Sequence, residues 1–129
     1  MIKKKPIKKR PKNLNLFTIR LPVNAVVSIM HRASGMALFL VLPLVLWSMQ
    51  VSLVSEDGYA HIYLMYHHWL FKLFLIALSW AFFHHFFAGI RHLAMDVHWM
   101  TSLQKARLSS RLVIGASVLC TAIFSVWIW

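Results

Sequence analysis

The chain has 129 residues, of which 60% are hydrophobic and 13% are charged, and its mean hydropathy is +0.65. This balance excludes an ordinary water-soluble domain. The formal net charge of +11 would suit a nucleic-acid binder, but eight of the 14 Lys and Arg residues precede residue 21. Because the rest of the chain offers no basic folded surface, we expect no nucleic-acid partner.

The first 20 residues, MIKKKPIKKRPKNLNLFTIR, form a basic segment ahead of a long apolar run. Cations placed just before an apolar helix are typical of a topology signal that also contacts anionic lipid headgroups. The apolar run is too long for a secretory signal, and no small-residue cleavage site follows it. We therefore expect residues 1–20 to form a cytoplasmic N-terminal segment at the membrane surface.

Three long stretches contain no Lys, Arg, Asp or Glu, and each reaches about 20 mostly apolar residues once its flanks are counted. They predict three transmembrane helices within a membrane domain at residues 21–129. The predicted spans are about 23–54, 66–92 and 108–129. The expected fold class is therefore an all-α integral membrane protein, whose three transmembrane helices form part of a heteromeric helical bundle.

The loops between the predicted spans differ in charge. The first, at residues 55–61, carries Glu56 and Asp57 and no cation, whereas the second, at residues 91–111, carries four Lys or Arg residues. Positive loops stay in the cytoplasm. The pattern predicts a cytoplasmic N-terminus and an external C-terminus at Trp129.

The first span contains the motif VSIMHRASG, in which Ser28 and Arg32 are four residues apart and share one helix face. An arginine near the end of a span is most often an anchor that extends to the lipid surface. The alternative is a polar pocket near the cytoplasmic interface. There, Ser28 and Arg32 would donate to a quinone carbonyl, or Arg32 would pair with a haem propionate. Pro43 is expected to kink this long helix.

The second span contains WAFFHHFFAGIRHLAMD at residues 80–96, with two adjacent histidines. At about 100° per residue, one helix stripe within about 60° of His85 consists of Ala81, Ala88, Gly89 and His92. Gly89 has no β-carbon and would let a flat macrocycle approach, so His85 is a better candidate ligand than His84. Taken alone, however, a stripe of small residues in a membrane more often indicates helix packing.

Two other residues bear on redox chemistry. Cys120 is the only cysteine, so this chain alone builds neither a disulfide nor a thiolate-bound cluster. Any redox role must then use histidine or a bound organic cofactor. Asp96, just beyond the second span, is a candidate proton relay, although an interfacial salt bridge is the commoner use of such a residue.

Three motifs together resemble the cytochrome b large membrane anchor subunit of succinate dehydrogenase (complex II). They are RPKNLNL at residues 10–16, S-x-x-H-R-x-S-G at 28–35 and H-x-x-x-G-I-R-H-L-x-M-D at 85–96. The resemblance implies that His85 is an axial ligand of the haem b iron and that Ser28 and Arg32 line the ubiquinone site. It also implies that His31 and Arg32 meet the haem propionates, with His92 a further candidate.

The resemblance implies a sister membrane anchor that supplies the other haem ligand, although His31 of this chain is a geometric alternative. It further implies an iron–sulfur subunit, and a flavoprotein subunit that holds the dicarboxylate site and oxidises succinate in the tricarboxylic acid cycle. No catalytic residue for that oxidation is expected in this chain. The location implied is the bacterial inner membrane, with the C-terminus periplasmic. The alternatives are a haem-free quinol:fumarate reductase anchor and a non-redox membrane assembly or transport subunit.

Overall fold

The computed structural model describes residues 19–129, which form four α-helices and contain no strand. The helices are α1 (Val23–Val54), α2 (Glu56–His67), α3 (Trp69–Asp96) and α4 (Leu103–Ile128). The predicted all-α membrane fold is confirmed. Most of the basic segment, and the whole of the motif at residues 10–16, lie outside the described residues.

Three of the helices, α1, α3 and α4, are long and apolar enough to cross a membrane. They contain 32, 28 and 26 residues, or about 48, 42 and 39 Å at 1.5 Å per residue. All three exceed the hydrocarbon core of about 30 Å, so they tilt or extend into the headgroup layers. The predicted spans at about 66–92 and 108–129 overlap α3 and α4, whose helical bounds are Trp69–Asp96 and Leu103–Ile128.

The remaining helix, α2, occupies the segment where the sequence predicted a loop. Ser55 caps it by accepting a hydrogen bond from the Gly58 backbone N–H at 3.0 Å. Glu56 and Asp57 in its first turn suit the positive end of the helix dipole. Gly58 also lies so near the Val51 carbonyl that a β-carbon there would clash. The acidic residues that marked the loop therefore begin a helix.

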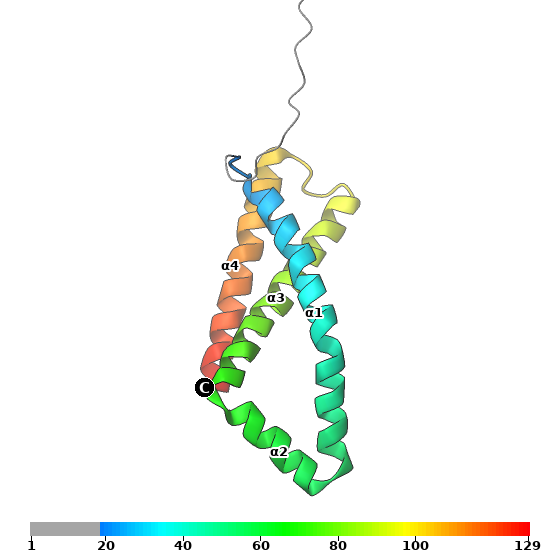
Figure 1. The fold of residues 1–129 in the computed structure, drawn as a ribbon. Coiled ribbons are helices and arrows are strands. Elements are labelled where there is room, and N and C mark those ends of the chain that lie inside the picture. Colours follow the sequence, from blue (N-terminus) through cyan, green and yellow to red (C-terminus); the bar gives the residue numbers. More distant parts are fainter. Residues whose placement is uncertain (1–18) are drawn as a thin grey trace, which may run out of the picture.

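Figure 1 shows how the helices are arranged: α3 and α4 lie side by side, and α1 crosses α3 in the half that contains Val23. Toward the other end α1 and α3 diverge, and α2 runs obliquely from the end of α1 to the start of α3 (Figure 1). We refer to these two halves as the crossing half and the α2 half.

The core of the crossing half consists of Val27, Ala88 and Val113, one from each long helix. Four buried residues of α3 recur at spacings of three and four and form one face: Ala81, His84, Ala88 and Arg91. On the facing side of α4, the fully buried Ser110 and Ser117 donate hydrogen bonds to carbonyls of their own helix. Small residues let helix backbones approach closely where lipid supplies no hydrophobic driving force.

Large apolar side chains lie mostly on the outside of the bundle. Phe39 is 73% exposed and Val126 is 82% exposed, and many other Leu, Ile, Phe and Trp residues behave similarly. Such a surface is unstable in water and needs lipid or another protein against it. The described residues therefore carry little core of their own, as expected for one component of a membrane bundle.

Ala88 gives the first testable prediction, because it is fully buried between α1 and α4. Ala88→Leu adds three carbons at this contact and should lower the free energy of unfolding by about 1–3 kcal/mol. Thermal unfolding of the detergent-solubilised protein measures the change. Ala77→Leu on the exposed side of the same helix is the matched control, and equal destabilisation by both would contradict the packing described.

Candidate functional site

Three of the sequence-predicted histidines come together between α1 and α3. The His31 ring stacks on His85, with centroids 4.3 Å apart and an interplanar angle of 13°. The His31 ring also lies near the His92 ring, with centroids 5.0 Å apart and an interplanar angle of 45°. His85 and His92 are seven residues apart, so they point from the same side of α3 two turns apart. The cluster lies in the crossing half of the bundle.

The adjacent histidines His84 and His85 have different surroundings. His84 is fully buried, its ring is stacked on Trp80 at 5.2 Å, and its Nε2 lies 3.4 Å from the Val27 carbonyl oxygen. His85 is half-buried, and its Nδ1 lies 3.0 Å from the His31 carbonyl oxygen. His84 therefore belongs to the packed face of α3, whereas His85 lies at the edge of that face.

The hydrogen bond of His85 determines which of its nitrogens is available. A carbonyl oxygen only accepts, so Nδ1 carries the proton and donates it to His31. The Nε2 of a neutral ring then keeps an in-plane lone pair. The His31 ring covers the face of His85 rather than its edge, so it leaves this lone pair uncovered. Metal-binding histidines are commonly held in this way, with the second nitrogen bonded to a backbone carbonyl.

The close approach beside His85 occurs at Gly35 of α1. A β-carbon at Gly35 would lie 2.6 Å from His85 Cε1, which no real side chain tolerates. At Gly89, where the sequence predicts the approach of a flat macrocycle, a β-carbon would lie at an ordinary 3.6 Å from His31 Nε2, and that approach stays a prediction. Ala81 and Ala88 share the buried face with His84. These two alanines therefore serve helix packing, and the glycine in closest contact with His85 is Gly35 of α1.

Ser28 and Arg32 lie on the same part of α1 as His31. Ser28 is half-buried and Arg32 is exposed. Neither side chain hydrogen-bonds to another described residue, so the hydroxyl and the guanidinium keep their donors for other groups. The structure thus places Ser28, His31 and Arg32 within about one turn of α1, and His31 joins them to His85 and His92 of α3.

Arg91 has a structural environment that the sequence analysis missed. It is 6% exposed, its Nε donates to the Ser109 hydroxyl at 3.0 Å, and its Nη2 donates to the Ala106 carbonyl at 3.4 Å. These bonds join α3 to α4 through neutral acceptors. Asp96 is exposed at the end of α3 and forms no ion pair with another described residue.

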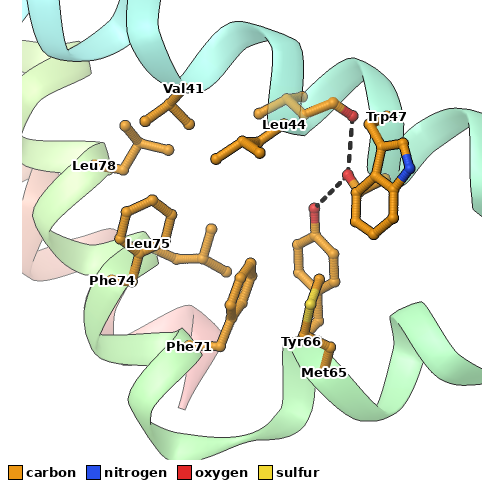
Figure 2. A pocket seen from close by; sticks show the side chains of 11 residues that line it. Val41, Leu44, Trp47, Met65, Tyr66, Phe71, Phe74, Leu75 and Leu78 are labelled. Atoms are coloured by element: carbon orange, nitrogen blue, oxygen red, sulfur yellow. Dashed lines mark hydrogen bonds between the residues drawn. The ribbon is translucent and has the colours of Figure 1, made fainter.

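A separate pocket lies in the α2 half, lined by eleven residues of α1, α2 and α3 (Figure 2). Its volume is about 150 Å³, and no charged side chain lines it. Its polar group is the hydroxyl pair of Ser48 and Tyr66, whose oxygens are 3.3 Å apart. In Figure 2 a dashed line from the Tyr66 hydroxyl marks this contact, and apolar side chains face the remaining space. This pocket is distinct from the histidine cluster.

Residues 19–129 contain no group of three or more His, Cys, Asp or Glu side chains arranged to hold a bare metal ion. A haem iron needs less from one chain, because the porphyrin supplies four nitrogens and a single histidine suffices on each side. The uncovered Nε2 of His85 fits that requirement. Cys120 is a free, half-buried thiol away from the cluster.

Fold and site define a polytopic helical membrane protein with a histidine cluster between its first two long helices. The chain matches the family of succinate dehydrogenase/fumarate reductase transmembrane subunits over residues 6–124, and it belongs to that family. The resemblance inferred from the three motifs is thereby confirmed.

Among its relatives are proteins named succinate dehydrogenase cytochrome b556 subunit. The protein from Coxiella burnetii is 38% identical over 123 residues, which cover 94% of this chain and 98% of the relative. The protein from Paracoccus denitrificans is 33% identical, with 84% of each chain covered. The protein from Rickettsia felis is 31% identical, with 88% of each chain covered.

Proposed function

We propose that this chain is the large membrane anchor of a succinate:ubiquinone oxidoreductase, where it ligates haem b and forms part of the ubiquinone-reduction site. The observation that carries the proposal is the orientation of His85. Its Nδ1 proton is donated to the His31 carbonyl, and its Nε2 accepts no hydrogen bond from another described residue. Family membership supplies the context in which a histidine held this way would bind haem.

Residues of this chain would hold the haem as follows. His85 would hold the iron through Nε2, and His31, Arg32 and His92 would meet the propionates, with Arg32 offering the planar fork that suits a carboxylate. When bound, the haem would supply a one-electron redox centre inside the membrane. The His31 ring already stacks on His85, so we assign the second histidine ligand to a sister anchor subunit.

Ubiquinone is the proposed substrate at Ser28 and Arg32. Both side chains have donors free of bonds to other described residues, and Arg32 is exposed at the face of α1 where a headgroup would arrive. The serine hydroxyl and the guanidinium would donate to a quinone carbonyl, and the positive charge would stabilise the negative charge that develops during reduction. Asp96, exposed at the end of α3, is proposed to exchange protons with water for this site.

The remaining subunits follow from the proposal. An iron–sulfur subunit would deliver electrons at the crossing half, and a flavoprotein subunit would oxidise succinate. The exposed apolar faces of α1 and α4 would contact the sister anchor and the bilayer. We place the complex in the bacterial inner membrane, with the N-terminus cytoplasmic and the C-terminus periplasmic, as the positive loops require.

A haem-free quinol:fumarate reductase anchor is the nearest rival, because the family includes fumarate reductase subunits. The orientation of His85 favours the haem-containing form. A reduced b-type α-band in the purified complex would support our proposal, and a colourless complex without haem would support the rival.

The two adjacent histidines should respond differently to substitution. His85→Ala removes the proposed axial nitrogen and should abolish or strongly perturb the haem spectrum. His84→Ala, which changes the packed face of α3, should leave that spectrum nearly intact. Optical spectra of the assembled complexes measure both. Loss of haem from the His84 variant alone would reverse the assignment of the ligand.

Substitutions of Ser28 and Arg32 should impair quinone reduction and leave the oxidation of succinate unaffected. Ser28→Ala or Arg32→Leu should slow electron transfer to ubiquinone by about a hundredfold, since one donor to a developing anion is typically worth about 3 kcal/mol. Electron transfer from succinate to an artificial dye should survive in the same complexes. If Arg32 is only an anchor, Arg32→Lys will be silent, because lysine reaches the lipid surface equally well. Wild-type rates in both Arg32→Lys and Ser28→Ala would exclude the quinone site.

Reporter fusions test the orientation. Three membrane crossings place the termini on opposite sides, and the positive loops place the N-terminus inside. A reporter fused after Trp129 should behave as periplasmic, and one fused within the α3–α4 loop should behave as cytoplasmic. The reverse pattern would refute the orientation.

A further inference from the structure

We infer that His84 is a positioning residue that holds the turn of α1 bearing Ser28 against α3; the inference rests on the proposed quinone site. Two adjacent residues of α3 reach two carbonyls of α1 that are one turn apart. His84 Nε2 lies 3.4 Å from the Val27 oxygen, and His85 Nδ1 lies 3.0 Å from the His31 oxygen. The pair of histidines therefore contacts α1 on both sides of Ser28.

Two hydrogen bonds between α1 and α3 restrict the movement of α1 more than a single bond would. Carbonyls four residues apart lie about 6 Å apart along a helix axis. A single hydrogen bond lets α1 rotate about the bonded atom, whereas a second bond one turn away also fixes its rotation and its translation along α3. The Val27 carbonyl has a second lone pair for His84, and the His31 carbonyl accepts both the Ser34 hydroxyl at 2.9 Å and His85 Nδ1 at 3.0 Å.

The surroundings of His84 keep its donor in place. The ring is fully buried and stacked on Trp80, and Val27 is itself fully buried in the core with Ala88 and Val113. Because a carbonyl only accepts, Nε2 must carry the proton, which leaves Nδ1 as an acceptor. Nδ1 has no hydrogen-bond partner among residues 19–129.

An unpaired buried nitrogen costs free energy, and a leucine would fill similar space without that cost. Stability alone therefore does not account for a histidine at this position. The contact with Val27 accounts for the histidine, because Ser28 is the next residue and its half-buried hydroxyl moves with the Val27 peptide. His84 would thus place the quinone-site serine relative to the His85 cluster without touching the substrate.

The test compares His84→Leu with His84→Gln in the assembled complex. Leucine fills the space without a donor, whereas the glutamine amide can still donate to Val27. His84→Leu should raise the KM for a short-chain ubiquinone about fivefold with kcat little changed, the size expected for losing one ordinary hydrogen bond. His84→Gln should restore KM to within about twofold of the wild type. Haem absorbance and succinate-to-dye activity should be unchanged in both.

Ser117→Ala is the matched control, because Ser117 is also fully buried but bonds only within α4; its quinone KM should be unchanged. An unchanged KM in His84→Leu would overturn the inference. A KM that stays high in His84→Gln, or an equal rise of KM in Ser117→Ala, would also overturn it. Loss of haem absorbance in His84→Leu would do the same. Failure of His84→Leu to assemble would count against it too, since leucine should be tolerated at this position.

Ser28→Ala, measured in parallel, separates this inference from the proposed function. If Ser28→Ala impairs quinone reduction and His84→Leu does not, only the positioning role fails. If neither change affects quinone reduction, the assignment of Ser28 to the quinone site is wrong, and the positioning role fails with it.

Discussion

The contact between α1 and α3 at Gly35 determines the geometry of the proposed functional end of the bundle. A β-carbon at Gly35 would collide with the His85 ring, so any larger residue would push the helices apart or turn the imidazole. With glycine there, His85 comes within hydrogen-bonding distance of the His31 carbonyl, and the His31 ring stacks on it. One missing methyl group thus sets the ring orientation, the tautomer and the nitrogen left for a ligand.

The same contact explains why the two halves of the bundle differ. In the crossing half, α1 bonds to α3 through the two histidines. Beyond Pro43, which removes one helical hydrogen bond and favours a bend, Ser48 of α1 meets Tyr66 of α2 instead of α3. The divergence visible in Figure 1 leaves the pocket of Figure 2 between the helices. The histidine contacts between α1 and α3 therefore lie in the crossing half.

The sequence was informative where a property depends on one helix alone. Hydropathy identified three long apolar helices. Helical periodicity grouped Ala81 and Ala88 with His85, whereas the structure packs both alanines on the buried face with His84. Properties that need two helices were not predictable. The glycine beside His85 belongs to α1, and which glycine comes close depends on the crossing of α1 and α3. The same limit hid the bonds of Arg91 to α4.

The missed helix α2 has a different cause. Its residues were interpreted by charge, because Glu56 and Asp57 distinguish the first predicted loop from the positively charged second loop. A serine followed by acidic residues also marks the start of a helix, because the serine caps the helix and the acidic residues favour its first turn. The two interpretations concern different properties, sidedness and local structure, and they are compatible.

Charge balance links the site to the proteins and lipids around it. The chain has 14 Lys and Arg residues against three Asp and Glu, and two of those acids lie at the start of α2, at the far end from the histidine cluster. Arg91 is buried on neutral acceptors, and Arg32 is exposed beside the cluster. Negative charge in the crossing half must therefore come largely from outside this chain. Haem propionates, a quinone undergoing reduction, anionic lipids and partner subunits all carry such charge, and each would be attracted to the end of the bundle where His85, Ser28 and Arg32 lie.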